Sequence, residues 1–261
     1  MTKASGQTDG SRRKPSRHPM SAGTSPPSLG ARIRSVDWAT IGAELDARGC
    51  ATISGLLTAD DCTAMTALYD QDARFRSTIV MARYGFGSGE YRYFGYPLPR
   101  LVAGLRQQLY ARLAPVANRW AEALGDHTHY PDRLPAFLEH CHAKGQRRPT
   151  PLLLRYRAGD YNCLHQDLYG AVAFPLQVTL CLSRRGADFT GGEFLLVEQR
   201  PRAQSRGEAV ILDQGDAVIF ANRYRPVMGK RGPYRVNLRH GVSRLHSGER
   251  HALGIIFHDA A

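Results

Sequence analysis

Residues 176–198 read LQVTLCLSRRGADFTGGEFLLVE, and this stretch decides the fold class. It contains two short runs, residues 176–182 and 193–198, that are rich in strand-forming side chains and are separated by the turn signal Gly191-Gly192. Similar runs occupy residues 152–156, 209–212, 217–220, 234–242 and 251–257. Seven short strands without intervening helices predict a sandwich or barrel, and the jelly roll is its natural closed form.

The residues before these strands have a mostly helical pattern. Asp37 and Thr58 are residue types that cap helix amino termini, and each precedes a segment that we expect to be helical. Apolar residues recur at near-helical spacing between Pro97 and Leu124. Helices therefore dominate the amino-terminal half.

These patterns divide the chain into parts. Residues 75–96 are rich in aromatic residues, Arg and Gly, and are expected to form extended segments and loops. We predict an α+β protein in which a helical portion and connector, residues 37–150, pack on a double-stranded β-helix or jelly-roll core, residues 151–261.

The positive charge is concentrated at the amino terminus. The formal net charge of the 261 residues is +12, and residues 1–36 carry seven Lys or Arg against Asp9 alone, which gives 7 − 1 = +6. This segment is rich in Ser, Pro and Gly, so it cannot offset the entropy lost on ordering. We predict a disordered basic tail over residues 1–36 that attracts polyanions without sequence selectivity.

The composition is that of a globular protein, and we expect a cytoplasmic one. Apolar residues make up 43% of the chain, and no apolar run reaches the roughly 18 residues that would span a bilayer. The cluster Arg12-Arg13-Lys14 is not followed by the apolar stretch of a secretory signal. The five cysteines are scattered without a Cys-x-x-Cys pair, so we expect reduced, buried thiols.

His165 and Asp167 form the motif that indicates chemistry. They follow the first expected strand, in a segment of strand or turn character. Side chains at positions i and i+2 of an extended chain project to the same face, so the imidazole and the carboxylate can point together into a barrel. Such a pair can bind a metal ion if a third ligand lies nearby.

The third ligand has four candidates in the carboxyl-terminal part: His240, His246, His251 and His258. Strand alternation favours His240, because it shares a face with Val236 and Leu238, where an unpaired imidazole would be costly. Two imidazoles and one carboxylate form the facial triad of non-heme Fe(II) oxygenases, which leaves three positions open for a bidentate cosubstrate and O2. A structural zinc site would instead be closed by four ligands.

Arg250 indicates an anion site in the last strand. It shares a face with Ala252 and Gly254, whereas His251 falls on the other face. The two small residues leave room for a small anion, which a guanidinium can bind through two parallel hydrogen bonds.

Two other motifs resemble binding sites but lack features that such sites require. The Gly-rich segment of residues 85–89 lacks the following helix start that a phosphate-binding loop requires. The pairs His127/His129 and His140/His142 lie in a Pro-rich connector without cysteine pairs, so we interpret them as solvated or capping histidines in preference to a second metal site.

The order of these motifs resembles the Fe(II)/2-oxoglutarate dioxygenases of the prolyl-4-hydroxylase-like type. The resemblance covers about residues 150–258 and comprises Tyr156, His165, Asp167, Gly191-Gly192-Glu193, Gly215-Asp216, His240 and, ten residues later, Arg250. A longer string, from about Trp38 to the end, is similar to a group of bacterial 2-oxoglutarate oxygenases described as acting on damaged DNA by oxidative demethylation. It includes Phe75-Arg76-Ser77, Tyr91 to Phe94, Cys141-His142, Gly145-Gln146, Pro149-Thr150-Pro151, Asp188 to Glu193 and Gly254 to Asp259.

The resemblance implies a role for each of these residues. His165, Asp167 and His240 would bind Fe(II), Arg250 would pair with the distal carboxylate of 2-oxoglutarate, and Tyr156 would add a hydrogen bond to this cosubstrate. Prolyl hydroxylases usually have Lys where Arg250 stands. The implied reaction consumes O2 and couples decarboxylation of 2-oxoglutarate, to succinate and CO2, to hydroxylation or oxidative demethylation of a substrate. That substrate is a modified nucleic acid, a peptide or a small molecule.

Substrate contacts and non-catalytic alternatives remain open at this point. The candidates for substrate contact are Arg83, Tyr91, Arg92, Tyr93 and Tyr169, which can equally pack the amino-terminal helices on the barrel. One alternative is a cupin-like metal-binding module. The small anion pocket at Arg250 argues against it, because a structural metal needs no such pocket. The other is a nucleic-acid-binding protein with the barrel as a scaffold, which requires a basic stripe with interleaved aromatic residues.

Overall fold

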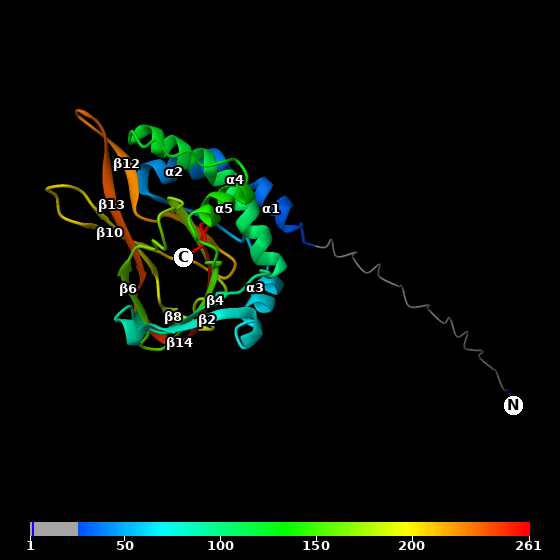
Figure 1. Ribbon diagram of the computed structural model, residues 1–261. Helices are drawn as coiled ribbons and strands as arrows, with labels where there is room; N and C mark the ends of the chain where they lie inside the picture. Colours follow the sequence, from blue (N-terminus) through cyan, green and yellow to red (C-terminus); the bar gives the residue numbers. More distant parts are fainter. Residues whose placement is uncertain (1, 3–25) are drawn as a thin grey trace.

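Two antiparallel sheets form the centre of the structure, a computed structural model that describes residue 2 and residues 26–261 (Figure 1). In this part of the chain, one sheet has eight strands in the order β1-β11-β7-β14-β5-β4-β2, with β8 paired to β14. The other has six strands in the order β10-β9-β13-β6-β3, with β12 paired to β13. This mixed architecture confirms the predicted α+β class with a jelly-roll core.

The strands of the two sheets have the following bounds. The eight-stranded sheet contains β1 (Cys50–Ile53), β2 (Phe75–Val80), β4 (Glu90–Phe94), β5 (Leu152–Arg157), β7 (Leu176–Cys181), β8 (Phe189–Gly191), β11 (Ala217–Ala221) and β14 (Leu245–Ile255). The six-stranded sheet contains β3 (Gly87–Ser88), β6 (Tyr161–His165), β9 (Phe194–Gln199), β10 (Arg206–Val210), β12 (Tyr224–Gly229) and β13 (Gly232–Val242). Every run that the sequence analysis expected to be a strand overlaps one of these.

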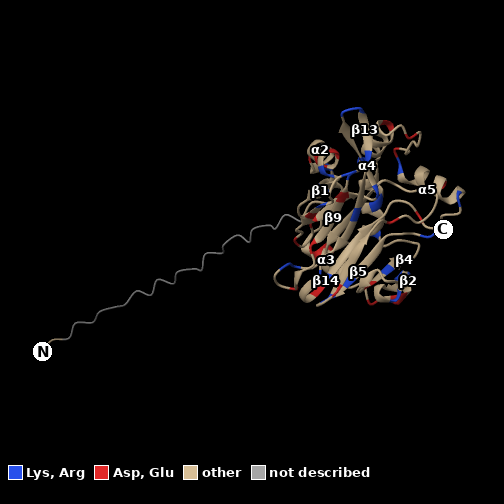
Figure 2. Ribbon diagram, turned by 90° about the vertical axis from the view of Figure 1, so that its left-hand side faces the viewer, with Lys and Arg blue, Asp and Glu red and all other residues tan. Residues whose placement is uncertain are grey.

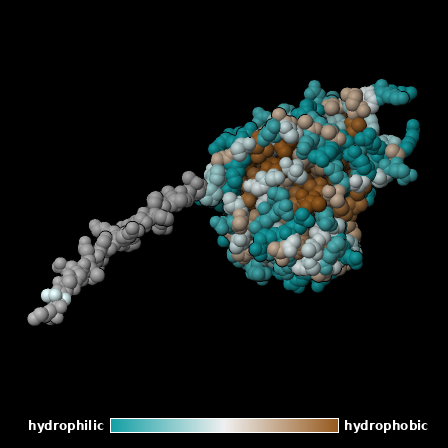
Figure 3. Space-filling model, turned by 180° about the vertical axis from the view of Figure 1, so that it is seen from behind, coloured by the Kyte–Doolittle hydropathy of each residue, from teal (hydrophilic) through white to brown (hydrophobic). Residues whose placement is uncertain are grey.

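The core lies between the two sheets because their facing strands carry apolar side chains. Phe194 of β9 and Phe220 of β11 come from different sheets, and their ring centroids are 4.6 Å apart. All five residues of β11 are buried, as expected for an apolar run covered on both faces. Seen from behind, the folded body exposes hydrophobic side chains around a hollow, surrounded by a largely hydrophilic surface (Figure 3).

Helices cover part of the sheets. Their bounds are α1 (Leu29–Ser35), α2 (Trp38–Arg48), α3 (Ala59–Thr66), α4 (Arg100–Ala123) and α5 (Leu134–Ala143), with the 3-10 turns η1 (Asp72–Arg74) and η2 (Met81–Tyr84). Asp37 caps α2 and Thr58 caps α3 in a capping box, which confirms both predicted helix starts. Arg106 of α4 donates hydrogen bonds to the carbonyls of Ile256 and Phe257, each at 2.9 Å, and thereby fixes the long helix to the end of β14.

The predicted tail boundary is wrong for residues 29–36. Leu29 and Ile33 lie one helical turn apart, so α1 can bury an apolar side, and Ile33 is 2% exposed. Arg32 also pairs with Asp61 of α3 at 2.5 Å. The burial of Ile33 and the Arg32–Asp61 pair together offset the entropy lost on ordering, which the composition alone does not predict. The rest of the predicted tail, apart from residue 2, lies outside the described residues.

Two smaller expectations need correction. The connector that holds the histidine pairs contains helix α5, in which His142 pairs with the buried Asp259 at 2.9 Å. Cys163 is exposed, although the other four thiols are buried as predicted. The Gly-rich segment of residues 85–89 contains β3, which pairs with β6. In residues 26–261, no helix combines the length and the apolar character needed to cross a membrane.

Candidate active site

A cavity of about 300 Å³ lies between the two sheets and brings together residues from both. His165, Asp167 and His240 line it from β6 and β13, and Arg250 lines it from β14. The remaining members of the Arg250 face, Ala252, Gly254 and Ile256, also line the cavity, whereas His251 packs against Tyr69 on the opposite side. The alternation of β14 therefore follows the sequence pattern.

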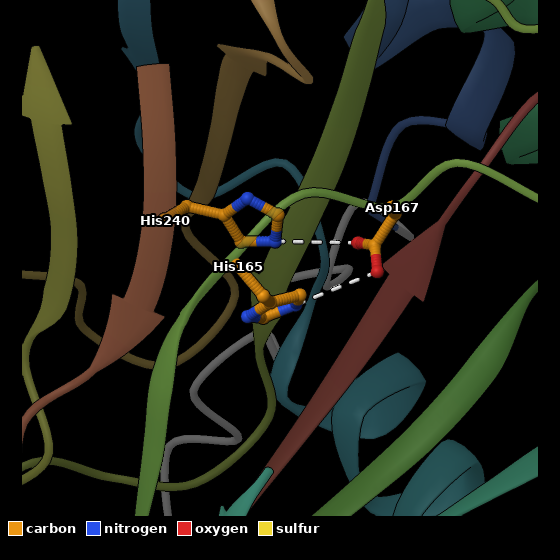
Figure 4. Close-up of side chains that lie close together, drawn as sticks. All are labelled: His165, Asp167 and His240. Carbon is orange, nitrogen blue, oxygen red and sulfur yellow. Dashed lines mark ion pairs between the residues drawn. The ribbon is translucent and has the colours of Figure 1, made fainter. Parts of the chain in front are cut away.

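The cavity contains a group of three side chains that could hold a metal ion. His165 and His240 are directly paired across β6 and β13, and Asp167 follows two residues after His165 (Figure 4). Asp167 lies 3.4 Å from Nε2 of His165 and 3.2 Å from Nε2 of His240. The ligand atoms all lie within 4.8 Å of one another, and they form the one such group among the residues that the structure describes. An ion at their centre would be within coordination reach of all three.

Hydrogen bonds and burial set the protonation of these groups. Nδ1 of His165 donates to the carbonyl of Cys163 at 2.8 Å, so Nε2 faces Asp167 and would bind a metal once it loses its proton. Burial opposes the ionisation of Asp167, but hydrogen bonds from both imidazoles outweigh it and hold the pKa of the carboxyl well below its usual range. Burial lowers the pKa of His240, and the charge of His165 adds to that effect. An anionic carboxylate and a neutral His240 are the forms that bind a metal.

Residues that the sequence analysis missed hold this group in position. Asn222 clamps the backbone of Asp167, because its side chain accepts from Asp167 N at 2.9 Å and donates to Asp167 O at 2.5 Å. Gln166 donates to the carbonyl of Leu238 at 2.7 Å. Gln177 is buried, with its Nε2 at 3.3 Å from Nε2 of His240. Asn222 and Gln177 are distant in the chain from the residues they hold, so no local motif indicates them.

Arg250 is a buried cation that faces the same cavity. Its side chain is 2% exposed, and Nη1 has no hydrogen-bond partner among the described residues. The guanidinium carbon lies 5.8 Å from the ring centroids of both Tyr156 and Phe189. The Tyr156 hydroxyl accepts a weak hydrogen bond from Asn162 at 3.4 Å. A buried guanidinium without an anion is costly, so this corner of the cavity fits a carboxylate.

The predicted substrate-contact residues separate into three groups. Tyr91 lines the cavity, whereas Arg83 is exposed and lies outside it. Arg92 alternates to the other face of β4, where it pairs with Asp72 at 2.6 Å and lies 4.9 Å from the Tyr69 ring centroid. Arg92 is therefore directed away from the cavity, whereas a contact between the exposed Arg83 and a substrate stays a prediction.

Tyr93 and Tyr169 instead connect to the carboxylate. Tyr169 donates to Asp167 Oδ1 at 2.6 Å, and its hydroxyl oxygen accepts a hydrogen bond from Tyr93 at 3.0 Å. Burial and the neighbouring carboxylate raise the pKa of Tyr169 well above its ordinary value, so the hydroxyl stays protonated and donates. Tyr169 also lines the cavity, so the substrate role that the sequence analysis gave these residues stays a prediction beside their hydrogen bonds with each other and with Asp167.

Comparison with known proteins identifies the family. The family model Oxygenase-NA, described as "Oxygenase, catalysing oxidative methylation of damaged DNA", matches residues 89–260. The chain belongs to the Oxygenase-NA family. This Oxygenase-NA protein is an oxidoreductase, and its His-Asp-His group and anion corner fit Fe(II) and 2-oxoglutarate.

The chain is also similar in sequence to two relatives and in fold to solved structures. Two uncharacterized proteins of Mycobacterium tuberculosis, from strains CDC 1551 and H37Rv, are each 50% identical to the Oxygenase-NA chain over 191 residues, covering 72% of this chain and 82% of theirs. The fold is similar to a 2OG-Fe(II) oxygenase family oxidoreductase from Burkholderia pseudomallei, with a TM-score of 0.51, 15% identity and coverage of 87% of this chain and 94% of that one. It is also similar to a prolyl 4-hydroxylase from Phytophthora capsici, with a TM-score of 0.52, 16% identity and coverage of 90% and 66%.

Proposed function

We propose that this oxygenase binds Fe(II) through His165, Asp167 and His240 and 2-oxoglutarate through Arg250. The observation that carries the proposal is the pairing of a three-ligand group with an unpartnered buried guanidinium in one cavity. Three protein ligands leave positions open for a bidentate cosubstrate and O2. A closed structural metal site would use a fourth protein ligand and would not need a buried cation.

The chain's own residues prepare the site for this chemistry. When bound, iron and 2-oxoglutarate supply the activation of O2 and the oxidation of a substrate C–H bond. Arg250 orients the distal carboxylate of the cosubstrate, and Tyr156 packs beside that guanidinium. Phe194 and Phe220 pack around His240, with the Phe220 centroid 4.6 Å from the imidazole, and exclude water from this side of the site. Tyr169 keeps Asp167 anionic and fixes its orientation.

We further propose that the substrate is a methylated nucleobase in damaged DNA. The family description supports this class. Hydroxylation would insert one oxygen atom from O2 into a methyl C–H bond, while the second oxygen enters succinate as 2-oxoglutarate loses CO2. The resulting hydroxymethyl group would leave the base nitrogen as formaldehyde, which returns the amine. The basic residues of the amino-terminal segment would add non-specific attraction to the polyanion.

The test separates the cofactors from the substrate. The full chain with Fe(II) and 2-oxoglutarate under anaerobic conditions should develop the visible charge-transfer absorption of a chelated 2-oxoacid, and an Asp167→Ala variant should not. In air, succinate release should rise when methylated single-stranded DNA is added, with formaldehyde formed in equal amount. Absence of the absorption band would refute the cofactor assignment. A band together with succinate release that only proline-containing peptides stimulate would refute the DNA assignment alone.

A further inference from the structure

One face of the six-stranded sheet has an arrangement that the oxygenase chemistry does not use. Along β13, Val236, Leu238 and His240 are buried, whereas the alternate residues Arg235 and Arg239 are exposed. Arg223, which precedes β12, is exposed as well. We call this surface, defined by Arg223, Arg235 and Arg239, the basic face. It is the solvent side of the strand that carries His240.

The basic face carries almost no compensating acidic charge. Within residues 26–261, Arg223 and Arg239 form no ion pair, and Arg235 has one weak partner, Asp126, at 3.8 Å. The guanidinium carbons of Arg223 and Arg235 lie 4.5 and 5.8 Å from the ring centroid of Tyr224, which holds both side chains in place without neutralising them. Arginine side chains that are fixed in position but not paired with carboxylates are suited to bind phosphate groups.

Two projecting hairpins extend the positive charge of this sheet. The β9–β10 and β12–β13 hairpins extend outward from the folded body (Figure 1), and Lys and Arg residues occupy the tip of the second one (Figure 2). Their exposed basic residues include Arg202, Arg206, Lys230 and Arg231. Arg235 and Arg239 are four residues apart, or about 13 Å along a strand, so the basic face can span several phosphates of one nucleic-acid strand.

Arg239, at one end of the basic face, is close along β13 to residues that line the cavity. Gly241 lies two residues beyond Arg239 on β13 and lines the cavity, as does Leu164 of β6, which is 39% exposed. Phe86 also lines the cavity, is 47% exposed and stacks on the exposed Tyr84 with ring centroids 5.5 Å apart. Exposed rings beside an opening can stack on unpaired bases.

We infer that the basic face binds the phosphate backbone of a single-stranded nucleic acid and presents one base to the cavity entrance. This inference rests on the proposed nucleic-acid substrate and adds where and in which form that substrate binds. Charge complementarity accounts for the backbone, and the stacked pair of Tyr84 and Phe86 distinguishes a nucleic acid from an acidic protein. A single strand is selected because its bases are accessible without the cost of opening a duplex.

The experiment measures binding of the full chain without iron or 2-oxoglutarate, by fluorescence anisotropy of a labelled oligothymidylate of about 15 nucleotides. The test variant is Arg223→Ala/Arg239→Ala. The matched control is Arg112→Ala/Arg147→Ala, which removes the same charge from exposed positions on α4 and the α5–β5 connector. Both variants keep the amino-terminal basic residues, so the contribution of that segment cancels. Melting temperatures verify that both variants are folded.

We expect the dissociation constant of the test variant to rise at least tenfold at about 0.1 M salt, and the slope of log K against log salt to fall by about 1.4, or roughly 0.7 per lost phosphate contact. The control should change less than about twofold. Equal weakening in both variants would overturn the inference, as would tighter binding of a duplex or of polyglutamate. Because the binding assay needs no iron, a chain that binds through this face but releases no succinate once iron and 2-oxoglutarate are supplied would contradict the proposed function and still support the binding surface.

Discussion

The two sheets of the jelly roll are built from similar alternating strands, yet they differ in what covers them. In the eight-stranded sheet, β11 is buried along its whole length and β14 is buried from Arg250 to Ile255. In the six-stranded sheet, β6 and β10 are mostly exposed or half-buried. The anion corner at Arg250 therefore lies in an enclosed region, and the metal group at His165 lies where the cavity opens. The enclosed sheet suits an invariant cosubstrate, and the open sheet suits a substrate that must enter and leave.

The largest effect should come from removing a ligand at the open side. His240→Ala leaves two ligands for the metal, so turnover should fall by more than about a hundredfold, because even outer partners of ligands contribute 10- to 100-fold. His246→Ala changes an exposed histidine six residues further along and should keep full activity. Succinate release measures both. Full activity in the His240 variant would move the third ligand to His246 or His258.

The next effect concerns the enclosed side. Arg250→Leu removes the buried cation that we pair with 2-oxoglutarate, and the cosubstrate should bind about a hundredfold more weakly, or roughly 3 kcal/mol, as for loss of a buried charge pair. Calorimetric titration with 2-oxoglutarate checks this. Arg244→Leu, at an exposed position, serves as the control. An unchanged affinity in the Arg250 variant would refute the anion assignment and the functional difference between the two sheets.

A pair of leucines tests the difference in packing directly. Leu253 of β14 is 0% exposed, and its truncation to Ala should lower the free energy of unfolding by about 2 to 3 kcal/mol through lost burial and a cavity. Leu195 of β9 is half-buried, and Leu195→Ala should cost less than about 1 kcal/mol. Urea unfolding compares the two variants. Similar losses at both positions would mean that the sheets are equally well covered.

The smallest predicted effect is a pH dependence arising at the enclosed end. Burial, followed by the charge of Arg106, lowers the pKa of His258 from its ordinary value of 6.5 to about 4. Below pH 6.5 the unfolded chain therefore binds a proton that the folded chain excludes, and stability falls with pH. At pH 5 the loss from this group is about 2 kcal/mol. His258→Gln should flatten the unfolding free energy between pH 7 and 5, and an unchanged slope would contradict this assignment.

Period-two alternation predicted more of the site than any motif did. It brought His165 and Asp167 to one side, placed His240 on an apolar face and separated Arg250 from His251. Residue type alone grouped Arg92 with Tyr91 as a substrate contact, although neighbouring residues of a strand point to opposite faces. Arg92 instead packs against Tyr69 and Asp72 from another part of the chain.

Other parts of the site have no local pattern to read. Asn222 lies 55 residues beyond Asp167, and the two meet only because the sheets close on each other. Composition also misled at the amino terminus, where Leu29, Ile33 and the Arg32–Asp61 ion pair fix a short helix in a segment rich in small and polar residues. Contacts of this kind depend on tertiary packing that overrides the local preference of the chain.

Asn222 fixes the main chain of Asp167, so the side chain at this position can be changed. Because Asn222 holds this residue by its main-chain N–H and carbonyl, the position of the chain does not depend on the carboxylate it carries. Shortening the side chain in Asp167→Ala would open a carboxylate-sized gap beside two histidines that stay in place. Such a gap invites chemical rescue, in which added formate restores metal affinity from solution. At position 167 the carboxylate ligand could thus be replaced by a small anion that the experimenter chooses.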